Sequence, residues 1–509
     1  MGKLKPVKAN FLDRVIAAVA PRWGLKRLQA RTRLELANYY RGADSSRLRS
    51  DWILTAMSDE TPPGWELDRL RSRSRDLNRN DPVASGATST LGINVIGSGL
   101  RPQSRIRADY LGISNEQTQK LQKQAEHIWQ TWKSQADAAN RLDFDEIQFL
   151  AFRKVIEDGE IIALPIWATE NWRYLNRAIE LIEADRLKSQ NYQAFNDTGI
   201  KFGPRGEPIS YSIASIDEKN KVTYKTIAAR DSNGRPKILH VFPTLRPGQS
   251  RGIPYFASVL SYFKDLADYL EAEIVAARVA ACLAIFITTQ DPYGTLAGMT
   301  AEREPSTNAR IQQIEPGLVG YLNPGEAVNV VDPKRPGDTF NGFIEGMFRI
   351  IGVALGLPYE LLIKDFSKTN YSSARAALLE GRRVFLNWRS WFARKFCQPI
   401  WELVLEEAFL RGLFEAPDFY RYKSEYCRAQ WIGGAWGWVD PVKEVEASKK
   451  AIDYSLSTLA EEAAGQGRDW EEVLEQRAKE NQKIEELGLS IINLKAPKED
   501  KNNAESQKE

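Results

Sequence analysis

Apolar side chains recur every three or four positions between residues 375 and 411, and this spacing predicts one long helix with a single apolar face. At a rise of about 1.5 Å per residue it would be about 55 Å long, whereas a globular helix averages roughly 11–12 residues. Pro399 predicts a kink, because proline lacks the N–H and clashes with the preceding turn. The residues of the predicted apolar face are Leu378, Phe385, Trp388, Phe392, Phe396, Ile400 and Leu403.

Similar spacing predicts further helices on both sides of this segment. Residues 66–96 form two predicted helices, with Asp81 as the cap and Pro82 in the first turn of the second. The others are predicted at 117–134, 143–157, 255–284 and 341–355, and again from 440 to about 487.

Strand signals fall in two regions. Residues 161–167 and 178–184 are apolar runs, and residues 200–240 alternate with period two between Pro/Gly turns, which favours antiparallel strands. Region 61–254 is therefore predicted to be an α+β domain. Short strands at 285–287, 318–321 and 328–331 predict a small β-rich insertion between two helices. The fold class expected for the chain is α+β and mainly helical.

A short helix-breaking segment, residues 358–374, precedes the long helix. Its tip is polar and weakly basic, with Lys364, Ser367, Lys368 and Asn370, and Arg375 follows at its exit. By itself this pattern is also compatible with a plain solvated loop.

Charge is distributed unevenly along the chain. The net formal charge is only +3, but residues 1–110 hold 20 Lys/Arg against 11 Asp/Glu, and residues 440–509 hold 11 against 17. The two ends are therefore expected to have different surroundings. Residues 1–60 are expected to form a basic arm, and residues 491–509, which lack aromatic side chains, a disordered tail.

Neither export nor membrane insertion is expected. No apolar run reaches the roughly 18 residues of a spanning helix, and no signal peptide is recognisable. The three cysteines, Cys282, Cys397 and Cys427, stand in no metal-binding or disulfide pattern, which fits a reducing compartment.

Enzyme motifs are missing from the sequence. There is no Walker motif, GxSxG elbow, CxxC pair, HExxH or Rossmann fingerprint, and only two histidines occur. No catalytic residue, cofactor or metal ligand is therefore predicted, and the chain is not expected to be an enzyme. One acidic cluster could bind a metal, although charged flanks at strand ends are the commoner explanation. Its members are Glu157, Asp158, Glu160, Glu183 and Asp185.

Four stretches together resemble the portal proteins of lambda-type tailed bacteriophages. They are RDLNRNDPVASGA at 75–87, HVFPTLRPGQSRGIP at 240–254, GLPYELLIKDFSKTNYSSARAALLEGRR at 356–383, and the region 430–478. The resemblance covers about residues 65–485. It implies a ring of subunits, commonly twelve, at one capsid vertex, through which DNA enters and leaves.

The resemblance also implies a division of the chain into parts. The wing would comprise residues 61–254 and receive the long helix 375–411. The stem helices would be 255–284 and 338–357, with the clip at 285–337 between them. Residues 358–374 would be the tunnel loop and 412–490 the crown.

In such a ring each charge is repeated by symmetry, so one lysine per loop becomes a circle of lysines. Lys364, Ser367, Lys368, Asn370 and Arg375 would then reach DNA phosphates without reading base sequence. An acidic stem flank would either face the bore or pair with Arg278 or Arg349 of a neighbour. That flank consists of Asp265, Asp268, Glu271 and Glu273.

The implied partners are other copies of the chain, double-stranded DNA, the terminase large subunit, the major capsid protein or scaffold, and head–tail adaptor proteins. The implied location is the capsid vertex of the virion, with the host cytoplasm during assembly. Two alternatives remain at this point: another virion component, such as an adaptor or minor capsid protein, and a metal-dependent DNA-processing enzyme.

Overall fold

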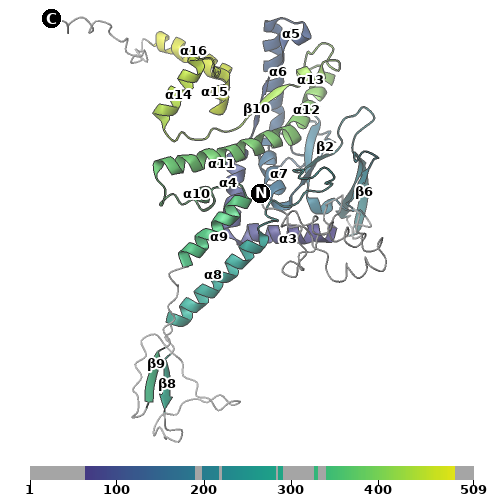
Figure 1. Cartoon of the computed structure of the whole chain (residues 1–509). Coiled ribbons are helices and arrows are strands. Elements are labelled where there is room, and N and C mark those ends of the chain that lie inside the picture. The colour runs from purple at the N-terminus through teal and green to yellow at the C-terminus, as the bar shows by residue number, and fades with distance from the viewer. Residues whose placement is uncertain are drawn as a thin grey trace, which may run out of the picture. The chain divides into compact units, whose positions relative to one another are not determined.

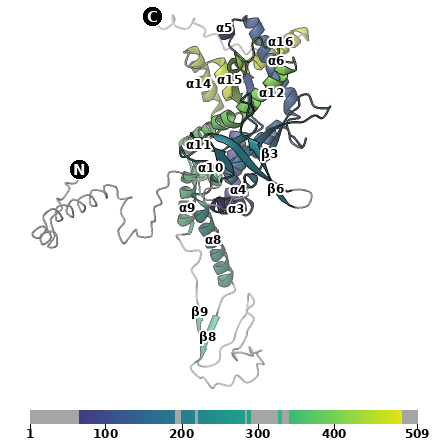
Figure 2. The same cartoon turned by 90° about the vertical axis from the view of Figure 1, so that its right-hand side faces the viewer.

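A computed structural model describes residues 64–189, 198–216, 221–281, 285–289, 326–330 and 340–487. The chain divides into two units, Met1–Glu60 and Thr61–Glu509, and all described residues belong to the second. Figure 1 and Figure 2 show its elements in two views. The predictions for the basic arm, the strand at 318–321 and the tail at 491–509 lie outside the described residues.

The first helices begin and end as the sequence predicts. Helix α3 (Gly64–Asn80) stops before Asp81, whose carboxylate accepts hydrogen bonds from the N–H groups of Val83 and Ala84. Pro82 then occupies the first position of α4 (Pro82–Val95), where no N–H is needed.

Three more helices follow: α5 (Ala108–Leu111), α6 (Asn115–Lys133) and α7 (Phe144–Asp158). Ser114 with Gln117, and Asp143 with Glu146, form capping boxes that fix the starts of α6 and α7. Gly159 ends α7 in the left-handed conformation, at a φ of 87°.

Two three-stranded antiparallel sheets confirm the predicted strands of the α+β region. In the first, β2 (Ile161–Trp167) lies between β3 (Arg177–Ile182) and β7 (Leu239–Val241). In the second, β5 (Pro208–Ile216) lies between β4 (Ile200–Phe202) and β6 (Val222–Ala228). The short helix η3 (Ala184–Arg186) follows β3.

One large hydrophobic core joins the helices of this region. Trp129 and Trp132 from α6 pack with Phe144 from α7 and Trp401, all nearly inaccessible to solvent. A smaller core around Ile162, Tyr211 and Ile213 lies between the two sheets. The large core contains several of the fourteen tryptophans, which fits their role in packing large interiors.

Helix α8 (Leu260–Ala281) begins later than predicted. The Tyr255 N–H donates to the carbonyl of Ile156 at the end of α7, and residues 255–259 form turns in place of a helix. Helix α9 (Phe340–Ala354) packs against α8, and the strands β8 (Ile285–Thr289) and β9 (Glu326–Val330) pair antiparallel between them in the sequence. The predicted strand 285–287 is confirmed.

The long helix is present but differs in two respects. It runs as α11 (Tyr371–Phe392), a π-helical turn η4 (Ala393–Cys397) and α12 (Gln398–Leu410). It starts at 371, four residues earlier than predicted, because Asn370 caps it. The irregularity lies just before Pro399, where the Gln398 N–H reaches back five residues to the carbonyl of Ala393.

The region after residue 412 contains two structurally different parts. Phe414, Phe419 and Tyr426 are buried in the large core, and after α13 (Lys423–Tyr426) the strand β10 (Ala429–Ile432) pairs with β1 (Arg101–Ser104). By contrast, α14 (Pro441–Asp453), α15 (Leu459–Gly465) and α16 (Trp470–Glu486) contain no buried residue.

Candidate functional site

The candidate site is the loop 364–370, which joins α10 (Tyr359–Ile363) to α11. Lys364 ends α10 in the left-handed conformation, at a φ of 61°. At the other end, the Asn370 side chain accepts a hydrogen bond of 2.9 Å from the Ser373 N–H, and the Ser373 hydroxyl accepts one of 3.0 Å from the Asn370 N–H. Asn370 therefore acts as a helix cap, and the loop is shorter than the predicted segment 358–374.

The middle of the loop is exposed to solvent. Lys364 and Ser367 are exposed, and even the aromatic ring of Phe366 is 39% exposed. The Asp365 carboxylate accepts the Ser367 N–H at 2.9 Å, and the hydrogen bonds from Ser367 lower the pKa of Asp365. The backbone thus makes a local turn and leaves the Lys364 side chain available for contacts outside the subunit.

The two lysines of the loop have different surroundings. Lys368 forms an ion pair with Glu345 of α9, and this hydrogen bond raises the pKa of Lys368 and lowers that of Glu345. No ion pair involves Lys364 in the part of the chain that the structure describes. Lys364 is therefore the loop cation with the freer charge, a difference that the sequence does not indicate.

Arg375 lies one turn inside α11 instead of at the exit of a loop. It is half-buried. The hydrogen bond with Asp440 raises the pKa of Lys443 in α14, and the nearby charge of Arg375 opposes this rise. Arg375 therefore faces the start of the C-terminal helices.

Three of the four acidic stem residues lie on the exposed side of α8, and Glu273 is only partly exposed. Asp265, Asp268 and Glu271 are exposed, and Asp268 pairs with Lys264 one turn earlier at 2.5 Å. Arg278 is exposed further along the same helix. Part of the predicted acidic flank is thus neutralised within its own helix.

Arg349 belongs to the cluster at the loop. It reaches Glu345 at 3.4 Å and lies over the ring of Tyr359, 5.5 Å from its centre. Glu345 therefore contacts both Arg349 and Lys368, and it links α9 to the loop.

An apolar stripe that sequence reasoning missed follows the outer side of α9. Phe343 and Ile350 are each 48% exposed and Val353 is 84% exposed. Their spacing of seven and three residues places them on one face of the helix. The neighbouring face, with Ile344, Met347 and Ile351, packs on the core. The stripe was detectable in the sequence, but the period alone does not tell which apolar side faces inward.

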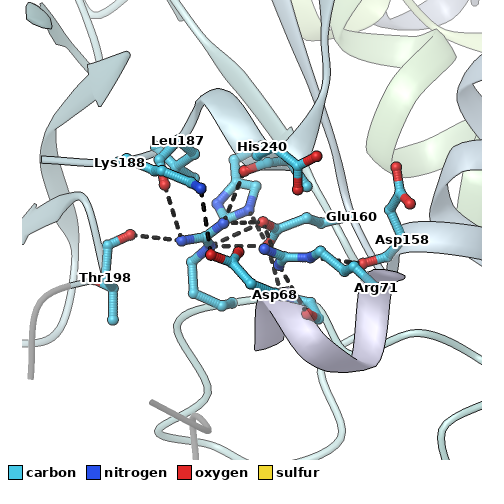
Figure 3. A network of polar contacts seen from close by, with 12 residues as sticks. Asp68, Arg71, Asp158, Glu160, Leu187, Lys188, Thr198 and His240 are labelled. Carbon is cyan, nitrogen blue, oxygen red and sulfur yellow. Dashed lines mark hydrogen bonds and ion pairs between the residues drawn. The ribbon is translucent and has the colours of Figure 1, made fainter. Parts of the chain in front are cut away.

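The acidic cluster around residue 160 is surrounded by basic side chains that pair with it. The fully buried Glu160 carboxylate accepts hydrogen bonds from Arg71 at 2.8 Å, from Arg251 and from the Gly252 N–H at 2.6 Å (Figure 3). Its other partner is His240, at 3.0 Å. Burial alone would raise the pKa of Glu160, but Arg251 and Arg71 hold it well below its usual range.

The remaining carboxylates of the cluster are also paired with cations. Asp158 binds Arg75 at 2.6 Å, and Lys154 lies within 4 Å of Glu157, Asp158 and Glu183. Asp185 pairs with Arg75 as well. Among the described residues no group of three or more His, Cys, Asp or Glu side chains is arranged to hold a metal ion. Arg71 and Arg251 could not be linked to Glu160 from the sequence, because they lie 89 and 91 residues away.

No helix in the described ranges is both long enough and apolar enough to cross a lipid bilayer.

Comparisons with known proteins agree with the sequence resemblance. The portal protein of Escherichia phage N15 is 26% identical over 454 residues, which is 83% of this chain and 85% of that protein. Portal protein B of Escherichia phage lambda is 24% identical over 487 residues, which is 89% of this chain and 91% of that protein.

Solved structures with a similar chain include one described as the neck of an empty GTA particle. The identity is 16% and the TM-score 0.42, over 81% of this chain and 96% of that one. A second, described as the virion of a native gene transfer agent particle, has 13% identity and a TM-score of 0.38, over 75% and 98%.

The family model described as "Phage portal protein, lambda family" matches residues 45–389, which is more than half of the sequence. The matched range includes α8 and α9 as well as the exposed loop 364–370. The chain therefore belongs to the lambda family of phage portal proteins.

Proposed function

We propose that copies of this chain close into a ring at one vertex of the capsid and that loop 364–370 lines the channel of that ring. The exposed polar loop between α10 and α11 is the observation that carries this proposal, because a channel lining must face away from its own subunit. A cyclic ring turns one exposed lysine per subunit into a circle of positive charge that meets DNA phosphates.

The stripe on α9 supports ring closure. Ile350 and Val353 stand exposed, and Phe343 is 48% exposed although its ring contacts Tyr269 of α8 at 5.0 Å between ring centres. Their burial against a neighbouring subunit would remove apolar surface from water. Burying a valine or isoleucine side chain contributes roughly 1.5–3 kcal/mol. The stem helices are therefore the proposed contact between adjacent copies, with Arg278 and the acidic side of α8 at its edge.

The parts of the subunit are proposed as follows. The wing is formed by the α+β region with the rod α11–η4–α12, the stem by α8 and α9, and the clip by the segment between them. Because residues 414–432 belong to the large core and to the β1–β10 ribbon, the crown in this proposal begins after β10 and comprises α14–α16.

The proposed role is structural and not enzymatic, in the virion and at the capsid vertex. Its partners in this proposal are double-stranded DNA, the terminase large subunit, the major capsid protein or scaffold, and head–tail adaptors. The buried, arginine-paired state of Glu160 supports a structural function for the acidic cluster.

Charge reversal at the loop tests the channel assignment. Procapsids assembled with the Lys364→Glu, Lys368→Glu double variant should contain normal rings in electron micrographs but protect several-fold less DNA from nuclease during packaging by their terminase. Lys395→Glu, an exposed lysine of η4, is the matched control and should package normally. Equal amounts of protected DNA in both variants would disprove the assignment.

A further inference from the structure

A cavity of about 560 Å³ lies at the end of the β1–β10 ribbon, far in the sequence from the loop 364–370. Its lining includes three arginines, Arg105, Arg107 and Arg428, together with Gln122 of α6 and Gln430 of β10. The three guanidinium groups are positively charged hydrogen-bond donors, so the cavity is suited to an acceptor of negative charge.

The three arginines are neutralised only in part. Arg107 forms two hydrogen bonds with the Glu425 carboxylate, at 2.9 and 2.6 Å, and stacks 3.8 Å from the centre of the Tyr110 ring. Arg105 donates to the neutral side chain of Gln430, at 3.1 and 2.9 Å. Arg428 is exposed and forms no ion pair with any described residue. Two positive charges therefore remain without a carboxylate partner within the described structure.

The other end of the same ribbon already holds an acidic segment of this chain. Arg101 donates to the carbonyl of Gly467 at 2.8 Å and lies 3.9 Å from Glu472, and Gln103 donates to the Asp469 carboxylate at 2.5 Å. Alternation along a strand places positions 101, 103 and 105 on one face. In the antiparallel register Gln103 stands opposite Gln430, so the cavity continues this face.

We propose that the cavity binds an acidic segment of another protein chain, with two or more side-chain carboxylates placed against Arg105 and Arg428. The β1–β10 ribbon would then bind carboxylates at both ends, those at the start of α16 at one end and those of the other chain at the cavity. Arginine is suited to this because its planar guanidinium pairs with a carboxylate through two parallel hydrogen bonds.

A protein segment fits this cavity better than a DNA backbone does. Glu425 stands beside Arg107, where it would repel a continuous row of phosphates, whereas an acidic segment needs only two carboxylates at chosen positions. A cavity of this volume is also within the roughly 300–1,000 Å³ of pockets that bind small ligands, so it has room for a few side chains.

Binding of a fluorescein-labelled octaglutamate peptide to the purified full-length protein tests the proposal. Arg428→Gln, which removes the charge and keeps much of the side-chain volume, should weaken binding at least tenfold. Arg428→Glu should weaken it further. Arg394→Gln is the matched control, since Arg394 is an exposed arginine on η4, and it should leave the affinity unchanged.

A second variant should act in the opposite direction. Glu425→Gln frees Arg107 from its carboxylate and should strengthen peptide binding several-fold, an effect that a damaged fold would not produce. Circular dichroism of each variant checks that its fold is retained.

Three results would overturn the proposal. The first is that the parent protein does not bind the peptide. The second is that Arg428→Gln and Arg394→Gln weaken peptide binding equally. The third is that Arg428→Gln leaves peptide binding unaffected but abolishes binding of a 20-base-pair duplex. The last result would assign the cavity to phosphates instead. Because the cavity and the loop 364–370 are tested with different variants and probes, a failure of one leaves the other standing.

Discussion

Glu160 illustrates how a residue's role depends on partners that are remote in the sequence. In the chain it follows Asp158 and looks like part of an exposed acidic strand end. In the structure it is completely buried and holds Arg71 of α3, Arg251 of the 245–254 loop and His240 of β7 together. Gly252 is needed beside it, because a Cβ atom there would lie 2.2 Å from the carbonyl oxygen of Gly159.

Replacing Glu160 with glutamine should destabilise the protein by about 3–5 kcal/mol, because two buried guanidinium groups lose their counter-charge. Urea denaturation measures this change. Glu180→Gln is the control, since Glu180 is 43% exposed and lies 4.0 Å from its only described ion-pair partner, Arg186; it should change stability by less than about 0.5 kcal/mol.

The same variant should change the acid sensitivity of the fold. The pKa of Glu160 is lowered in the folded state, so its contribution is fully present above the ordinary carboxyl pKa and is lost as the pH falls through the lowered folded value. Glu160→Gln should therefore have a flatter stability curve on the acid side. An unchanged curve would contradict the stabilising role of the ionised carboxylate.

At the scale of elements, the packing of α16 is expected to depend on the protonation of Glu126 in α6. The Glu126 carboxylate accepts the Ser104 N–H at 2.7 Å. Burial, the largest cause, and the nearby carboxylates of Asp469, Glu471 and Glu472 together raise its pKa to about 7. Two cations of the same contact oppose this repulsion: Arg101 near Glu472, at 3.9 Å, and Lys123 with Glu475, at 2.5 Å.

The sign of the effect follows from the raised pKa. Below the ordinary glutamate pKa, protonated Glu126 makes its full contribution to the stability of the folded state. This contribution, about 3 kcal/mol, is lost as the pH rises toward 7. Amide hydrogen exchange of α16, corrected for intrinsic rates, should therefore show stronger protection at pH 5 than at pH 8. Glu126→Gln should remove this difference, whereas the exposed Glu116→Gln should keep it. Equal protection at both pH values in the parent protein would contradict this prediction.

For the long rod α11–η4–α12, the sequence predicts the helix but not the position of its irregularity. Its apolar period is clear in the sequence, but the place of its irregularity is decided by backbone hydrogen bonding. Pro399 has no N–H to donate, and the turn before it widens over Ala393–Cys397, where Phe396 and Cys397 are buried in the core. The stacking of Phe392 on Phe396, 4.9 Å between ring centres, accompanies this wider turn.

For the whole molecule, ring formation is the property that the apolar stripe on α9 predicts. Val353→Asp should reduce closed rings at least tenfold, because a carboxylate would have to be buried without a partner at the proposed contact. Native mass spectrometry counts the assembled subunits. Asn341→Asp adds the same charge to an exposed position of α9 outside the stripe and should assemble normally. Rings of Val353→Asp at the parent's abundance would place the contact elsewhere.

Local features of the fold were determined by the sequence alone. The Asp81–Pro82 start of α4, the strand β2 at 161–167 and the helices α6 and α7 follow from capping residues and from apolar periods, which act over a few residues. The family was also recognisable from the order and spacing of several stretches, and the match over residues 45–389 confirms it.

The tertiary structure decided which distant groups meet. It joined β10 to β1, buried Phe414, Phe419 and Tyr426 in the large core, paired Lys368 with Glu345 and left Lys364 exposed. Periodicity and capping concern neighbours along the chain, whereas these contacts arise when cores close over hundreds of residues. For that reason the sequence indicated a basic loop and an acidic cluster, and only the folded chain showed which charges were paired with a partner.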